Sequence, residues 1–131
     1  MTDGPYVLTL RQPWASAVFL ARGGKNVENR TWKTNYRGRL YIHAAGREDI
    51  YAPHWVWDLV GGRGTLPLSA IIGYVTITAC QYDSGVNNRW AHPNMWHWFF
   101  TSPALLTEAI PATGGRALWP LPGNINWKET S

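Results

Sequence analysis

Apolar and polar residues alternate in short runs along most of the chain, a pattern typical of half-buried β-strands. Residues 7–10 are an apolar run with β character, and residues 39–44 place two aliphatic side chains on the face opposite His43. The longest run, residues 68–80, is rich in isoleucine, valine and threonine, which favour strands. We expect residues 68–80 to form a central strand of a sheet.

Shorter strands are expected on both sides of this central run. Residues 27–31 alternate in the same way, and residues 95–100 and 102–110 read as two further β segments. Residues 117–127 contain closely spaced prolines and a glycine, which interrupt regular structure. We therefore expect an irregular closing segment at this end of the chain.

Two helices are expected between the strands. Pro13 opens the first, because proline is tolerated in a first turn, and the helix covers residues 14–21 until a glycine pair ends it. The second begins near Glu48, and Pro53 interrupts it or restarts it over residues 54–60. Short strands with these two helices predict the α+β class, as a small, closed, β-dominated barrel with flanking helices.

Length and composition favour one soluble domain. The chain has 131 residues, of which 45% are hydrophobic, so residues 1–131 are expected to share a single core. Its apolar runs are far shorter than the roughly 20 residues that cross a bilayer, and its first residues do not form a signal peptide. We expect a cytoplasmic protein without membrane contact. Cys80 is the only cysteine, so an internal disulfide is excluded and an inert buried thiol is expected.

Charge and aromatic content indicate an anionic, flat ligand. The formal net charge is +4, and nine of the twelve basic residues are arginines, which suit phosphates and base edges. Nine tryptophans exceed what a small core buries easily, so some are expected at the surface, where indoles beside arginines stack on bases. The same residues also dominate protein interfaces, so a protein partner remains an alternative.

One short segment concentrates residues with binding chemistry. Lys25 precedes the strand at residues 27–31, on which Glu28 and Arg30 share a face, and Trp32 continues the same spacing. This spacing predicts an ammonium, a carboxylate, a guanidinium and an indole in one small volume, which is costly unless a ligand or mutual pairing satisfies the charges. Two interpretations follow: a binding site, or a Glu28 salt bridge that pins the first helix to the barrel.

Three segments resemble the ASCH domain family in the order in which they occur. They are LTLRQPWA at residues 8–15, GKNVENRTW at residues 24–32 and YRGRLYIHA at residues 36–44. The nearest likeness is to the ASCH domain of the thyroid-receptor-interacting transcription coactivators, and it covers roughly the first third of the chain. ASCH domains are similar to PUA domains. The resemblance therefore implies a PUA-like β-barrel with a helix-flanked cleft that binds RNA, single-stranded DNA or a nucleotide.

The binding interpretation gives each residue of the cluster a role. Lys25 and Arg30 would neutralise a phosphate or donate to a base carbonyl, and Glu28 would accept from a base amine or ring N–H. Trp32 would stack on the base. Arg37, beside Gly38, would contact the phosphodiester backbone, although a solvated charge at a strand edge is the alternative.

Further candidates lie next to the three segments. Arg11 and Gln12 precede the first helix, where free amide groups suit an anion, whereas Trp14 is interpreted as a core anchor. His43 is expected near the cleft, with a structural role as the alternative. His92, His97 and Asp83 do not have the spacing of a zinc site, so neither a metal nor another cofactor is expected.

Catalysis is the second hypothesis. Some ASCH relatives are amidohydrolases that deacetylate an acetylated cytidine with a Gly-x-Lys-x-x-Thr-x-Arg element and a later glutamate. Glu28 stands here at the threonine position, which removes that hydroxyl, and Asp83 is only a positional guess for the later carboxylate. If the chain is an enzyme, Lys25 and Glu28 would activate water in a hydrolase or ribonuclease. We rank binding first and hydrolysis second.

Overall fold

Six strands form one mixed sheet in the order β2-β5-β4-β3-β1-β6. The computed structural model describes residues 4–126, so residues 1–3 and 127–131, including the last residue of the predicted tail, lie outside the described residues. In this part of the chain, no helix is long and apolar enough to span a membrane. The elements are β1 (Tyr6–Gln12), α1 (Trp14–Ala17), β2 (Val27–Arg30), β3 (Gly38–Glu48), α2 (His54–Leu59), β4 (Ala70–Tyr82), β5 (Trp96–Pro111) and β6 (Leu118–Pro120).

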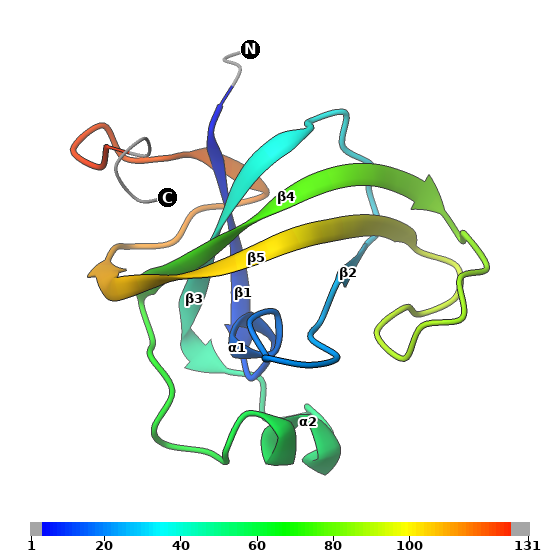
Figure 1. Cartoon of the computed structure of the whole chain (residues 1–131), viewed down its shortest axis with the longest axis horizontal. Helices are drawn as coiled ribbons and strands as arrows, with labels where there is room; N and C mark the ends of the chain where they lie inside the picture. The colour runs from blue at the N-terminus through cyan, green and yellow to red at the C-terminus, as the bar shows by residue number, and fades with distance from the viewer. Residues whose placement is uncertain (1–3, 127–131) are drawn as a thin grey trace.

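The sheet wraps around α1, and β4 and β5 run along each other as its longest strands (Figure 1). β1 pairs in parallel with β3, and all other neighbours pair antiparallel. A parallel pair needs a long crossover. Here that crossover contains α1 and β2, which places both elements beside the end of β1.

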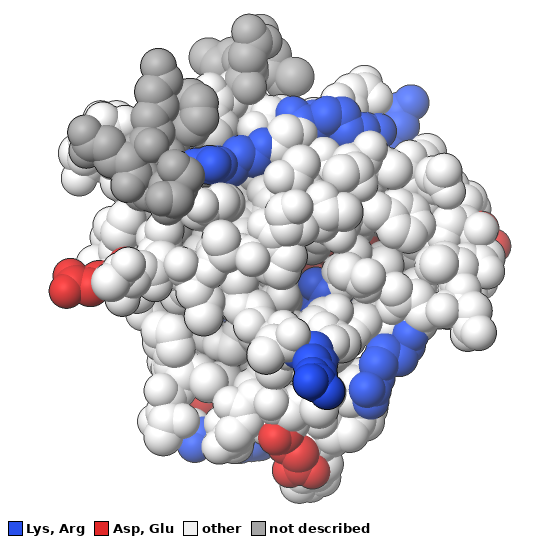
Figure 2. Space-filling view, in the orientation of Figure 1, with Lys and Arg blue, Asp and Glu red and all other residues white. Residues whose placement is uncertain are grey.

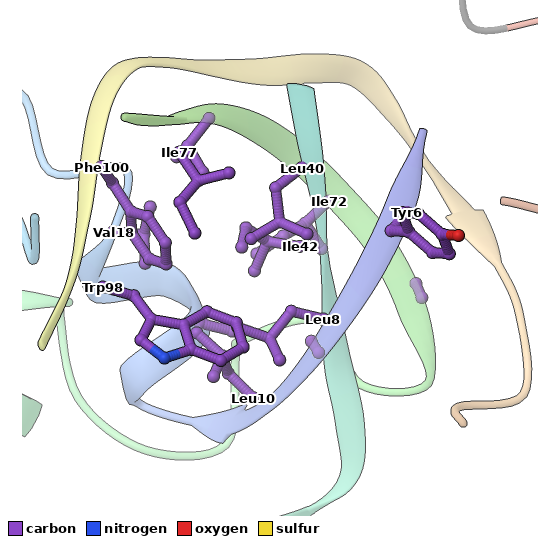
Figure 3. Packing of buried hydrophobic residues seen from close by; sticks show 14 residues of the cluster. Tyr6, Leu8, Leu10, Val18, Leu40, Ile42, Ile72, Ile77, Trp98 and Phe100 are labelled. Carbon is purple, nitrogen blue, oxygen red and sulfur yellow. The ribbon is translucent and has the colours of Figure 1, made fainter. Parts of the chain in front are cut away.

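The predicted alternation is confirmed by the core. Leu40 and Ile42 are fully buried and converge with Leu8, Ile77 and Trp98 inside the curved sheet (Figure 3). The opposite face of β3 is covered as well, because the segment after β5 packs over it. The second layer is built from the buried residues Val7, Tyr41 and Ile71, with Ile110, Trp119 and Leu121 packed against them.

Both predicted helices are shorter than expected. α1 ends at Ala17, since the backbone N–H of Lys25 donates to the Ala17 carbonyl (2.8 Å) and turns the chain back. The second helix does not begin near Glu48, because Glu48 still pairs with Gln12 in the β1–β3 ladder. α2 therefore begins only after Pro53.

Two strand predictions also need correction. The two segments predicted at residues 95–100 and 102–110 form one strand, β5, which begins at Trp96 and bends where Ser102 adopts a positive φ of 55° and its register against β4 shifts. The closing segment is not wholly irregular, because β6 pairs with the start of β1. The α+β class expected from the sequence is confirmed.

The sheet is not closed, and this corrects the closed barrel expected from the sequence. β2 and β6 lie at its two ends, and β6 pairs only with residues 6–8 of β1, so the rest of β1 has an open edge that is separated from β2 by a seam. A side chain bridges the seam: the Arg30 guanidinium of β2 donates to the Thr9 carbonyl of β1 (3.3 Å).

Candidate functional site

A cleft of about 700 Å³ opens at this seam. Its walls come from the end of β1, from α1, from β2, from the segment around α2 and from the loop between β4 and β5. A few lysine and arginine groups lie over the region where Figure 1 draws α1 and that loop, and another group lies along the top of the view (Figure 2). The volume lies within the range of about 300–1,000 Å³ that is typical of small-molecule sites.

The floor of the cleft is a three-residue charge cluster. Glu28 accepts from both neighbouring cations: its Oε1 lies 3.2 Å from Lys25 Nζ and its Oε2 lies 2.8 Å from Arg30 Nε. Lys25 Nζ also donates to the Val27 carbonyl. Lys25 is only 4% exposed, whereas the Arg30 side chain is 26% exposed, so Arg30 is the cation of this cluster that solvent reaches.

Local structure explains why these three groups meet. Glu28 and Arg30 are two residues apart on β2 and therefore share one face, as the sequence predicted. Lys25 reaches the same carboxylate from the segment that links α1 to β2. Glu28 thus pins this segment to the sheet and also holds two cations at the cleft, so the two interpretations of the sequence describe the same contacts.

Tryptophans form the wall beside this floor. The Trp14 ring lies edge-on to the Trp90 ring at 6.5 Å, and the Trp55 ring lies 5.2 Å from the Trp90 ring. Trp14 Nε1 donates to Asp49 Oδ2 (2.9 Å). Trp14, expected to be only a core anchor, also lines the cleft, and Asp49 fixes the plane of its indole.

The loop of residues 83–95 closes the other side. The Arg89 guanidinium lies 4.2 Å from the Trp55 ring centre, which is within cation–π distance. Asn29 fastens the loop to β2: its Nδ2 donates to the Trp90 carbonyl (2.8 Å), and its Oδ1 accepts from the His92 backbone N–H (2.8 Å). This loop therefore places one aromatic and one cationic side chain at the cleft.

The lining residues that sequence analysis missed include Asn29, Asp49, Trp55 and Arg89. Arg89 and Trp55 come from segments far from the β2 motif, and no local pattern relates them to it. The arginine and tryptophan content of the chain was the one signal that pointed to them.

Of the predicted binding residues, Arg11, Lys25, Glu28 and Arg30 line the cleft. Trp32 does not: β2 ends at Arg30, so Trp32 no longer follows the strand alternation. Its ring packs edge-on against Trp98 at 4.8 Å. The indoles that can contact a ligand in this cleft are therefore those of other tryptophans, such as Trp14 and Trp55.

Gln12 and His43 are interior residues. Gln12 is fully buried, where its Nε2 donates to the Pro67 carbonyl (3.0 Å) and its Oε1 accepts from the Ser16 N–H (2.9 Å). His43 is 1% exposed and lies on the other side of β1, with Nε2 2.6 Å from the Ala112 carbonyl. Both side chains hold segments together instead of facing the cleft.

Arg37 and Gly38 also lie outside the cleft lining. The Arg37 guanidinium donates to the carbonyls of Thr34 (3.0 Å) and Tyr36 (2.9 Å) in its own turn, while Gly38 begins β3 with a φ of 114°. Burial raises the pKa of the neighbouring Tyr36 phenol above its ordinary value. These residues shape the turn before β3.

Within residues 4–126, no three His, Cys, Asp or Glu side chains are grouped as metal ligands would be. Asp83 Oδ1 accepts from the Asn94 N–H (3.0 Å), and His97 Nδ1 lies 2.7 Å from Ser84 Oγ. Both residues therefore organise the loop of residues 83–95. Asp83 does not line the cleft, whereas Asp49 does.

Replacing Asn29 tests the attachment of this loop. Asn29→Ala is expected to lower the free energy of unfolding by about 1–3 kcal/mol, because it leaves the Trp90 carbonyl and the His92 N–H without their partner. Amide hydrogen exchange should accelerate within residues 83–95 and change little in β3 and β4. Asn87→Ala, in an exposed position of the same loop, is the control. Equal exchange in both variants would contradict the anchoring role.

Comparison with known proteins agrees with this fold and motif pattern. Residues 8–102 match the ASCH domain family. The chain is 26% identical to mouse (Mus musculus) Activating signal cointegrator 1 and 25% identical to the human (Homo sapiens) protein of that name, in each case over 95% of the chain. It spans 23% of the length of these relatives. The match covers β1 to the middle of β5, including the whole Lys25–Glu28–Arg30 cluster, and the chain therefore belongs to the ASCH domain family.

Proposed function

We propose that the chain binds single-stranded nucleic acid or nucleotides in the cleft between α1, β2 and the loop of residues 83–95. The observation that carries this proposal is the combination of indoles and arginines in one open cleft: Trp14 and Trp55 beside Arg30 and Arg89. Aromatic faces stack on any base, and guanidinium groups bind phosphates, which together support recognition of a nucleotide.

RNA and single-stranded DNA share this chemistry, and both belong in the test. Fluorescence anisotropy with short labelled RNA and DNA oligonucleotides measures the affinity of each. Trp55→Ala is expected to weaken binding about 5- to 150-fold, which corresponds to the roughly 1–3 kcal/mol of one base–aromatic stack. Trp55 is 37% exposed, so the variant should remain folded.

Tyr82→Ala is the matched control, because Tyr82 is an exposed aromatic residue (55%) that does not line the cleft. Its affinity should equal that of the wild type. If Trp55→Ala binds as tightly as Tyr82→Ala, the cleft is not the binding site. If no oligonucleotide binds the wild type, a protein partner becomes the better proposal.

The contacts of Glu28 favour binding over hydrolysis. A general base must lie within hydrogen-bond reach of the attacking water. Glu28 is only 7% exposed, and each of its oxygens already accepts from a cation, at 3.2 Å and 2.8 Å, which leaves little room for that water. Turnover of an N4-acylated cytidine or a short RNA that disappears in both Lys25→Ala and Glu28→Gln would nevertheless replace binding by hydrolysis.

A further inference from the structure

The two cations on the cleft floor are already neutralised in part. Lys25, Glu28 and Arg30 together carry a net charge of one, and Glu28 lies between the two cations. Lys25 is buried, and its ammonium also donates to a backbone carbonyl. A phosphate at this depth would have to lose most of its hydration beside the Glu28 carboxylate, which is unfavourable. The floor is therefore better suited to the neutral, hydrogen-bonding edge of a base.

At the mouth of the cleft, in contrast, the positive charges are exposed and are not neutralised by a carboxylate among residues 4–126. Arg11 and Arg89 both line it and both are exposed. Within the described residues, the only ion pairs are the two that Glu28 makes, so neither arginine is paired with a carboxylate. The other carboxylate of the cleft, Asp49, accepts from Trp14 Nε1 (2.9 Å) and from the Tyr51 N–H (3.0 Å).

Arg89 is also oriented by its neighbours. Its guanidinium carbon lies 4.2 Å from the Trp55 ring centre and 5.6 Å from the Trp90 ring centre. A guanidinium that stacks through its face keeps its N–H donors in the plane of the group, directed outward at the edge. That edge matches two oxygens of a phosphate, and the stacked indole reduces the freedom that Arg89 would lose on binding.

We propose that Arg89, together with Arg11, forms a phosphate subsite at the mouth of the cleft. The ligand is then a single nucleotide unit, with its base toward Trp14 and the Lys25–Glu28–Arg30 floor and its phosphate at the rim. This inference rests on the proposed function and adds to it the direction in which the ligand lies and the residue that recognises its charge.

The test compares the four ribonucleosides with their 5′-monophosphates by calorimetry on the wild type, Arg89→Ala and Arg89→Lys. In the wild type, each monophosphate that binds is expected to bind roughly 10- to 100-fold more tightly than its nucleoside, as a charge-assisted pair of hydrogen bonds provides. Arg89→Ala should reduce this ratio to about threefold or less. Arg89→Lys should restore only part of it, because lysine keeps the charge without the planar fork.

Arg47→Ala is the matched control, since Arg47 is an exposed arginine outside the cleft lining, and it should keep the wild-type ratio. With a short single-stranded oligonucleotide, Arg89→Ala should also make the slope of log K against log salt shallower by about 0.7. Equal affinity for nucleoside and monophosphate in the wild type, or an unchanged ratio in Arg89→Ala, overturns the phosphate subsite and leaves the proposed function standing. If neither nucleosides nor monophosphates bind while oligonucleotides do, the single-nucleotide assignment is overturned; if no ligand binds, both proposals fail.

Discussion

Glu28→Gln is expected to lower the free energy of unfolding by about 3 kcal/mol. The amide keeps the size of the side chain and removes its charge, so Lys25 and Arg30 lose their shared counter-ion. Breaking a buried ion pair from one side costs about 3–5 kcal/mol, because the remaining charge stays desolvated. The lower end of that range applies here, since Arg30 is 26% exposed and water can solvate it in part. Urea denaturation measures the change.

Glu108→Gln is the control, because Glu108 is exposed on β5 and lies outside the cleft lining; its effect should stay within about 0.5 kcal/mol. Adding Lys25→Met to Glu28→Gln should recover part of the lost stability, since it removes the buried cation that Glu28→Gln leaves unpaired. A loss in Glu28→Gln no larger than that of Glu108→Gln would show that the cluster does not hold the α1–β2 segment to the sheet.

Features that depend on neighbours in the sequence were predictable. Strand alternation placed Leu40 and Ile42 in the core, and both are fully buried. The same rule placed Glu28 and Arg30 on one face, and Glu28 now accepts from Arg30. A side-chain direction set by the strand period needs no knowledge of the rest of the fold.

Features that depend on distant segments were not predictable in this way. Trp32 was placed on the Glu28 face by extending the strand period, but the strand ends at Arg30 and the ring packs on Trp98 instead. Arg89 and Trp55 meet across the cleft from segments that no spacing rule connects. The sequence therefore located the floor of the site, and the aromatic wall became visible only with the arrangement of the loops.

The open seam links the fold to the proposed function. A fully closed barrel would pair the backbone of β1 with that of β2, whereas here the Arg30 side chain crosses to the Thr9 carbonyl. Side chains can rearrange around a ligand at much lower cost than a ladder of backbone hydrogen bonds. At the seam, the strands on either side are held by backbone hydrogen bonds, whereas the polar side chains of the cleft floor can rearrange around a ligand.

Trp98→Ala is expected to lower the free energy of unfolding by about 3–5 kcal/mol, the range for removing a buried aromatic side chain. Trp98 is fully buried and pairs on β5 with Glu28 of β2, so it lies directly beside the residue at the centre of the cleft floor. Its Nε1 donates to the Trp32 carbonyl (3.3 Å), and its ring packs against the Trp32 ring. The substitution therefore removes core volume and also releases the segment after β2.

Two further variants separate these contributions. Trp98→Phe keeps most of the apolar volume and loses the N–H, so its cost should be about 1–2 kcal/mol, of which roughly 1 kcal/mol is the hydrogen bond to Trp32. Trp55→Ala, at the exposed rim of the cleft, should cost less than about 1 kcal/mol, because water already reaches that ring. Thermal and urea unfolding of all three variants measure the loss of stability in each and rank the three losses. If Trp98→Ala costs no more than Trp55→Ala, then Trp98 does not support β2 from the core, and the rigidity of the cleft floor must come from the Glu28 ion pairs alone.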